Sequence, residues 1–216
     1  MPAPVGNPSF GKSSPCSCVE ERQRLLRLQQ RREAANLGAL REATFQSFDP
    51  RVPGMQQAFQ ASVDFAMNPR GWLVLLGPCG SGKTHLAAAI ANEQFDSGTG
   101  VFFTTVPDLL DLLRTSFAAL EKYSQLITLL REVELLVLDD LGAQKATMWS
   151  NEKLLQILNS RAESALATVI TAIPREFQGL DERLRSRLQD SRLVTSVLFE
   201  HVKDFRLSKL APGRGT

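Results

Sequence analysis

The sequence has few cysteines, no long apolar run and no marked excess of charge of either sign. Three cysteines in 216 residues do not make a disulfide framework, so we expect a reducing compartment. No apolar run approaches the ~20 residues that a membrane-spanning helix needs, and the N-terminus lacks the apolar core of a signal peptide. We therefore expect a cytoplasmic protein without a membrane partner. The 25 basic and 23 acidic residues nearly balance, so any nucleic-acid binding must depend on local placement of charge.

The most informative stretch is a short apolar run that is followed by glycines. Residues 72–76 read Trp-Leu-Val-Leu-Leu, which is too short for a helix and too apolar for a surface strand, so we predict a buried parallel strand. Residues 77–84 read Gly-Pro-Cys-Gly-Ser-Gly-Lys-Thr, and the spacing G-x-x-x-x-G-K-T after a strand is typical of a phosphate-binding loop. Backbone N–H groups in such a loop surround phosphate oxygens at the positive end of the next helix.

The loop predicts a bound nucleoside triphosphate together with Mg²⁺. The ammonium of Lys83 would reach the β- and γ-phosphates, and the hydroxyl of Thr84 is placed to ligate Mg²⁺. The residues that we expect to bind the nucleotide here are Gly77, Pro78, Cys79, Gly80, Ser81, Gly82, Lys83, Thr84 and His85.

A second apolar run, residues 135–138, ends in two adjacent carboxylates, Asp139 and Asp140. We expect Asp139 to hold Mg²⁺, directly or through water, and Asp140 to polarise the water that attacks the γ-phosphorus. Two acids after a strand can instead cap the next helix. The phosphate-binding loop upstream favours the metal and catalytic roles.

Apolar strands alternate with helical patterns through most of the chain. Helices are predicted at residues 54–67, from 84 to the glycines near 98, from 106, over 114–131 and over 149–163, and further strands at 101–105, 168–171 and 194–199. This alternation predicts an α/β fold of the P-loop NTPase class, with a parallel five-stranded sheet flanked by helices. The expected divisions are a disordered tail at 1–18, a helical N-terminal arm at 19–43, the nucleotide-binding domain at 44–210 and a disordered tail at 211–216.

The N-terminal part leaves several alternatives open. Residues 19–42 suit an exposed helix, which is either a solvated linker or a docking arm for a partner. We interpret Cys16 and Cys18 as unliganded thiols and not as zinc ligands, because no second Cys or His pair lies nearby to complete a zinc site. Phe45 and Phe48 either lie near the adenine side of the site or pack in the core.

Three further groups of residues are candidates for the site. Phe117, Lys122 and Tyr123 either stack bases and hold the phosphate backbone of a single nucleic-acid strand or belong to ordinary surface packing. Thr171 either contacts the attacking water or the γ-phosphate, or is a core strand residue. Residues 180–188 carry three arginines, of which one at a subunit boundary would reach a neighbour's γ-phosphate; the alternative is a solvated helix face.

Together, these motifs resemble the bacterial helicase loaders of the DnaC/DnaI type, a family of AAA+ ATPases. The resemblance covers residues 41–207 and is carried by Gly82-Lys83-Thr84-His85-Leu86-Ala87, Leu138-Asp139-Asp140-Leu141-Gly142-Ala143 and Arg183-Leu184-Arg185-Ser186-Arg187-Leu188. It implies that Arg187 is an arginine finger and that Arg206 is a sensor arginine that contacts the nucleotide. It also implies an ATPase that forms a homo-oligomer with ATP, grips single-stranded DNA and places the replicative DNA helicase on it. The IstB-type transposition helpers share these motifs but have a transposase as their partner.

The chain departs from the helicase-loader pattern in two places. The family usually has Asn at the end of its Thr-Ser-Asn or Thr-Thr-Asn motif, whereas this chain has Ile173. An apolar side chain cannot orient water, so we expect slow hydrolysis, unless Thr171 takes this role, and a nucleotide-gated adaptor with little turnover is a second hypothesis. Relatives also often carry a larger zinc-binding, helicase-docking module where this chain keeps only Cys16 and Cys18.

Overall fold

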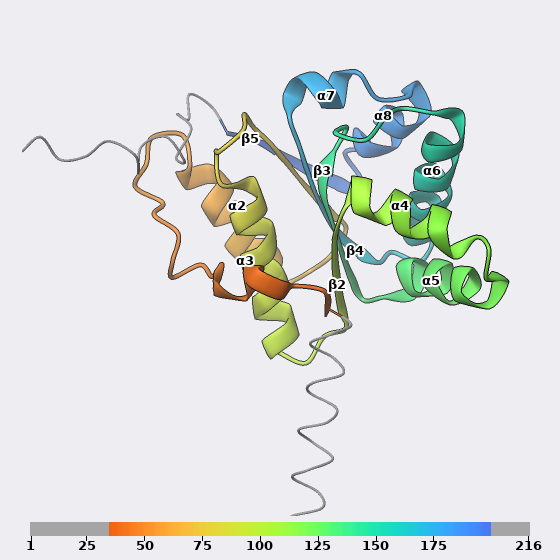
Figure 1. Ribbon diagram of the computed structural model, residues 1–216. Helices are drawn as coiled ribbons and strands as arrows, with labels where there is room; N and C mark the ends of the chain where they lie inside the picture. Colours follow the sequence, from red (N-terminus) through yellow and green to blue (C-terminus); the bar gives the residue numbers. More distant parts are fainter. Residues whose placement is uncertain (1–34, 200–216) are drawn as a thin grey trace, which may run out of the picture.

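The computed structural model describes residues 35–199, which form a parallel five-stranded sheet with helices on both faces (Figure 1). The strand order is β2-β3-β4-β1-β5, and all neighbouring strands run parallel. The strands are β1 (Trp72–Leu76), β2 (Val101–Thr105), β3 (Leu135–Leu141), β4 (Ala167–Ala172) and β5 (Val194–Leu198). The predicted fold class is confirmed, and each predicted strand is present.

Two groups of helices cover the sheet. The 3-10 helix η1 (Gly38–Glu42), α2 (Gln56–Met67) and α3 (Lys83–Asp96) lie on one face, whereas α4 (Val106–Ser116), α5 (Leu120–Glu132), α6 (Met148–Glu163), α7 (Pro174–Gln178) and α8 (Glu182–Leu188) lie on the other (Figure 1). Successive strand residues point to opposite faces, so Leu73 joins the first core and Val74 the second. Burial on both faces explains why the central strands are continuous apolar runs.

The helical stretch predicted over residues 114–131 is interrupted. Helix α4 ends at Ser116, a turn occupies residues 117–119, and α5 begins at Leu120. The turn is closed by hydrogen bonds from the N–H of Phe117 to the Arg114 carbonyl and from the N–H of Ala119 to the Ser116 carbonyl. The interruption leaves the ring of Phe117 59% exposed at the corner between the two helices.

The end of the predicted exposed arm belongs instead to the nucleotide-binding domain. Ala35 and Leu37 are only 1% exposed, and both pack in the core between the sheet and α3. The side chain of Asn36 donates a 2.9 Å hydrogen bond to the carbonyl of Phe103 in strand β2. A continuous exposed helix to residue 42 is therefore wrong, since residues 38–42 form the 3-10 helix η1. The rest of the arm, Cys16, Cys18, Arg206 and both predicted tails lie outside residues 35–199.

Arg161 of α6 is a fully buried charge that links α5 to β4. Its guanidinium donates to the carbonyls of Leu130 and Val133, to the Thr168 hydroxyl and to the Ala167 carbonyl. Burial lowers the pKa of Arg161 to about 10. These bonds fix the start of the strand whose other end carries Thr171.

Within residues 35–199, no helix has the length and apolar character that crossing a membrane requires.

Candidate nucleotide-binding site

The phosphate-binding loop connects β1 to α3, as the sequence predicts. Helix α3 begins at Lys83 with no acidic side chain in its first turn, so its positive end is not neutralised from within the helix. The residue before it, Gly82, has φ of +88°, a conformation that favours glycine. A Cβ atom on Gly82 would also lie 2.8 Å from the ring of Phe48. Glycine is therefore required at this position for two reasons: the positive φ and the close approach of the Phe48 ring.

A cavity opens beside the loop. Its volume of about 350 Å³ is within the usual size range of ligand sites. It is lined by Cys79, Gly80, Gly82, Lys83, Thr84 and His85 on the loop side, by Asp140 and Ile173 from the strand ends, and by Ser47, Phe48, Asp49, Val52 and Met55. The predicted loop residues Gly77, Pro78 and Ser81 do not line the cavity. The Lys83 side chain lies across the loop, where its ammonium donates a 2.9 Å hydrogen bond to the Pro78 carbonyl.

The predicted metal ligands Thr84 and Asp139 lie in contact. The Thr84 hydroxyl is 3.0 Å from both carboxylate oxygens of Asp139, although the two residues belong to α3 and β3. Asp139 is 3% exposed, and this burial raises its pKa, while a hydrogen bond from Thr171 acts in the opposite direction. Hydroxyl and carboxylate oxygens are ligands that Mg²⁺ prefers, so this pair fits the predicted metal site.

Asp140 points to the cavity because strand β3 bulges. The register of β3 against β4 shifts between Leu138 and Leu141, and Asp140 has φ of +56°. Such an angle costs a non-glycine residue about 1–2 kcal/mol. The bulge places the Asp139 side chain inward and that of Asp140 against the cavity. The two carboxylates thus differ in environment, as the different roles predicted for them require.

Thr171 lies behind these carboxylates and not beside the cavity. Its side chain is fully buried, and its hydroxyl donates a 2.6 Å hydrogen bond to Asp139 and accepts one of 3.0 Å from the N–H of Asp140. Because the single hydroxyl hydrogen is already used, the predicted contact with the attacking water or γ-phosphate does not match this position. Thr171 instead positions both acids. The residue that faces the cavity from this strand end is Ile173.

The two predicted adenine-side phenylalanines have different positions. Phe48 lines the cavity and stacks on Phe59 with ring centroids 5.7 Å apart. Phe45 does not line the cavity and packs edge-on against Phe59 at 5.8 Å. One ring is thus at the site, and the other belongs to the core packing.

The predicted arginine finger, Arg187, is on α8 and away from the cavity of its own chain. Its Nε atom donates a 3.0 Å hydrogen bond to the side chain of Asn159 on α6. The other two arginines of the cluster have local partners: Arg183 pairs with Asp181, and Arg185 donates to the Gln178 carbonyl. Of the three, Arg187 is the one held by a side chain from another helix.

Aromatic and basic side chains from α4, α5, α6 and the turn at residues 117–119 form a second surface, of which the sequence predicted only a part. We call it the aromatic surface: Arg114, Phe117, Tyr123, Trp149 and Lys153. The rings of Phe117 and Tyr123 meet edge-on at 5.5 Å, the Arg114 guanidinium lies 5.1 Å from the Trp149 ring, and the Lys153 ammonium lies 6.0 Å from the Tyr123 ring. Lys122, which was predicted with Phe117 and Tyr123, is exposed on α5.

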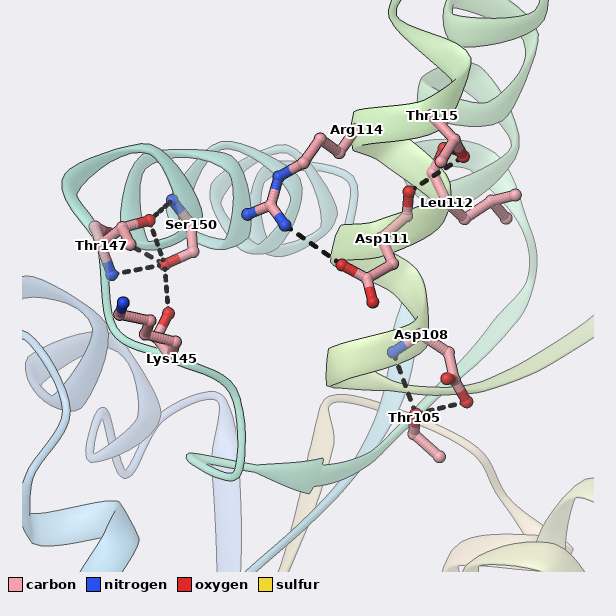
Figure 2. A network of polar contacts seen from close by, with 9 residues as sticks. All are labelled: Thr105, Asp108, Asp111, Leu112, Arg114, Thr115, Lys145, Thr147 and Ser150. Atoms are coloured by element: carbon pink, nitrogen blue, oxygen red, sulfur yellow. Dashed lines mark hydrogen bonds and ion pairs between the residues drawn. The ribbon is translucent and has the colours of Figure 1, made fainter.

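The N-terminus of α6 is fixed opposite α4. Figure 2 shows the Arg114 side chain extending from α4 toward α6, with an ion pair of 3.2 Å to Asp111. Thr147 and Ser150 form a capping box at the start of α6, and the Ser150 hydroxyl lies 3.4 Å from the Lys145 carbonyl. Arg114, Phe117, Thr147 and Trp149 line a groove between the helices. Sequence periodicity gave no sign that Trp149 would meet Arg114.

Comparison with known proteins decides the family. The model of the IstB-like ATP binding proteins matches residues 18–203. The chain belongs to this family. The family is one of ATP-binding proteins, and the fold of the chain is that of the AAA+ P-loop ATPases.

This family member is also similar to helicase loaders. It is 26% identical over 157 residues to the replicative helicase loader DnaC of Escherichia coli (strain K12), covering 70% of this chain and 64% of DnaC. It is 30% identical over 169 residues to the replicative helicase loader DnaI of Bacillus subtilis (strain 168), covering 73% of this chain and 54% of DnaI. The matches thus span between half and two thirds of these relatives. The crystal structure of the DnaC helicase loader has the same fold, with a TM-score of 0.64, 23% identity, and coverage of 73% of this chain and 97% of that one.

Proposed function

We propose that this protein is an ATP-driven loader that holds single-stranded DNA and a replicative DNA helicase, and that its ATP-bound form is a homo-oligomer. The observation that carries the ATP-driven part is the pair of carboxylates on the β3 bulge, with Asp139 against Thr84 and Asp140 against the cavity. The similarity to DnaC and DnaI supports the choice of partner.

In the proposed ATP cycle, the loop N–H groups and Lys83 hold the phosphates, while Thr84 and Asp139 hold Mg²⁺. The metal ion would neutralise charge on the transferred phosphoryl group. Asp140 acts as the base toward the attacking water. Arg187 of a neighbouring copy would complete the site, because this side chain does not line the cavity of its own chain.

Slow hydrolysis is part of this proposal. Ile173 offers no polar atom to the water at the edge of the cavity that it lines. Thr171 does not compensate, since its hydroxyl is buried and bonded to Asp139. A chain with slow turnover would stay on DNA longer in each cycle, and ATP hydrolysis would time its release.

The aromatic surface is our candidate for the contact with single-stranded DNA. Rings stack on unpaired bases, and cations beside them hold the phosphate backbone. Phe117 is 59% exposed, so its ring is accessible. The surface is also connected to the ATP site, since the chain runs from Asp140 through the loop at residues 142–147 to Trp149 at the start of α6. Loss of the γ-phosphate could thus alter the DNA contact through a movement of this one loop.

Fluorescence anisotropy with a labelled thymidine oligonucleotide tests this surface. We expect Phe117→Ala to weaken binding about tenfold, the usual effect of losing one stacked base. The matched control is Met67→Ala, which removes an apolar side chain 82% exposed at the end of α2, on the other side of the sheet. Equal affinities of Phe117→Ala and the parent would remove the DNA contact from this surface.

The match to the IstB-like family keeps the transposition-helper hypothesis open. Under that hypothesis the partner is a transposase instead of a helicase. Capture of the tagged chain from its own cells with ATP, with Lys83→Ala as the control, separates the two. A replicative helicase enriched over the control supports the loader, and a transposase in its place assigns the chain to transposition.

A further inference from the structure

We infer that His85 is a positioning residue that fastens the phosphate-binding helix to the loop on the base side of the cavity, and that it does not bind the phosphates. The base-side loop comprises residues 44–49. The inference rests on the proposed ATP site and adds to it a residue that couples recognition of the base to recognition of the phosphates.

His85 follows Lys83 and Thr84 in the first turn of α3, but its ring is bonded to the base-side loop. Its Nε2 atom lies 2.9 Å from the carbonyl oxygen of Thr44 and 3.2 Å from the hydroxyl of Ser47. A carbonyl oxygen only accepts, so Nε2 carries a hydrogen and donates it.

The loop that receives this bond is itself closed by hydrogen bonds. The N–H of Thr44 donates to the Ser47 hydroxyl (3.0 Å), and the N–H of Ser47 donates to the Thr44 hydroxyl (3.2 Å). The Ser47 hydroxyl also lies 3.1 Å from the Glu42 carbonyl. A closed turn of this kind moves as one unit, so a contact at Thr44 and Ser47 also fixes the residues that follow.

The next residue, Phe48, carries this effect into the cavity. Its ring stacks on Phe59 at 5.7 Å and 17°, and it meets the His85 ring at 5.4 Å and 58°. Gly82 also lies against this ring, and its missing Cβ leaves room for the ring. His85 and Gly82 thus hold one aromatic ring against the loop that binds phosphate. We infer that this ring forms the wall on which the adenine base packs.

A positioning role of His85 and direct phosphate binding by His85 predict different effects on the affinities for two ligands. If His85 fixes the base side, its loss should weaken ATP binding and leave binding of inorganic tripolyphosphate unchanged, because the latter has no base. A histidine that touches the phosphates would contribute to both. Lys83→Ala is the matched control, since it should weaken both ligands.

Titration calorimetry of the full chain with each ligand in excess Mg²⁺ makes the comparison. For His85→Leu we expect ATP affinity about tenfold lower, the effect of one hydrogen bond, with tripolyphosphate affinity within about twofold of the parent. For His85→Gln, whose amide nitrogen can replace Nε2 as donor, we expect most of the ATP affinity to return. If tripolyphosphate is too weak a ligand, CTP replaces it, because its pyrimidine ring is too small to cover an aromatic wall that fits a purine.

Two results would overturn the inference: equal weakening of both ligands by His85→Leu, or no weakening of either. If His85→Leu does not fold, Ser47→Ala, which removes the second acceptor and opens the turn, must show the same selective loss of ATP affinity. A parent chain that binds neither ATP nor tripolyphosphate would instead refute the proposed ATP site itself.

Discussion

Thr171 at the end of β4 donates a 2.6 Å hydrogen bond to Asp139 at the end of β3. The same hydroxyl accepts the N–H of Asp140, whose backbone is in the left-handed region. One side chain therefore holds the proposed metal ligand and orients the proposed base. This arrangement explains how the side chains of the two acids point in different directions although the residues are adjacent in sequence.

The first prediction concerns this hydroxyl. Thr171→Val keeps the shape but removes the hydrogen bond to Asp139 and the acceptor of the Asp140 N–H. We therefore expect ATPase activity to fall at least about tenfold and the Mg²⁺ concentration for half-maximal activity to rise. Thr171→Ser should restore both. Thr195→Val, the same change at an exposed position in β5, serves as the control. An unchanged Mg²⁺ dependence in Thr171→Val would show that the hydroxyl does not position these acids.

The second prediction separates a slow enzyme from an adaptor. Steady-state ATPase rates should rise several-fold in Ile173→Asn, which supplies a polar group at the cavity, and fall by about 10²–10⁴ in Asp140→Asn, which loses the base. An adaptor also gains from Ile173→Asn but should lose little activity in Asp140→Asn, because there is little turnover to lose. That outcome would reject the enzymatic role.

The third prediction concerns a catalytic group from a neighbouring copy. Arg187→Ala should leave ATP affinity nearly intact and lower the ATPase rate by about 10³ or more. Mixing it with Asp140→Asn subunits should recover activity, since each supplies what the other lacks. Arg183→Ala, which removes an exposed arginine paired with Asp181, is the control. An ATPase rate per subunit that is independent of protein concentration would contradict the finger.

The fourth prediction concerns the stability of the folded state, which the buried carboxylate of Asp139 lowers. Burial raises the pKa of Asp139, so the folded state retains the proton to higher pH than the unfolded state. This contribution to stability is present below the unfolded pKa and is lost as pH rises through the raised folded pKa. Thus, without nucleotide or Mg²⁺, Asp139→Asn should melt a few degrees above the parent at neutral pH, and the gap should shrink as pH falls.

Asp190→Asn is the opposite control for this measurement. The hydrogen bond from Arg192 lowers the pKa of Asp190 to about 2, so its ionised form already suits the folded state. Replacing it should give no gain in melting temperature. If Asp139→Asn is no more stable than the parent at neutral pH, the buried carboxylate carries no net cost.

The sequence predicted the parts of the molecule that depend on local pattern. Short apolar runs gave the strands because the sheet is buried on both faces. The spacing of glycines, Lys83 and Thr84 gave the loop, since that conformation depends on neighbouring residues. The pairing of Thr84 with Asp139 also followed, because both lie where parallel strands end.

The rest depends on contacts between distant segments. Whether Thr171 faces the cavity or the core is set by the register of β4 against a bulged β3, and a strand residue shows no sign of that in its sequence. The contact between Trp149 and Arg114 requires the N-terminus of α6 to lie within reach of a side chain from α4. Figure 2 shows the Arg114 side chain extending from α4 toward α6. The bond from His85 to Thr44 joins residues 41 positions apart. Such contacts follow from the fold and not from periodicity.

Control of DNA binding by ATP can be measured as the affinity of the parent and of Lys83→Ala for single-stranded DNA, each with a non-hydrolysable ATP analogue, with ADP and without nucleotide. We expect the parent to bind DNA more tightly with the analogue than with ADP, and Lys83→Ala to bind weakly with both. A parent whose DNA affinity is the same with the analogue, with ADP and without nucleotide would contradict the proposal that ATP controls the grip.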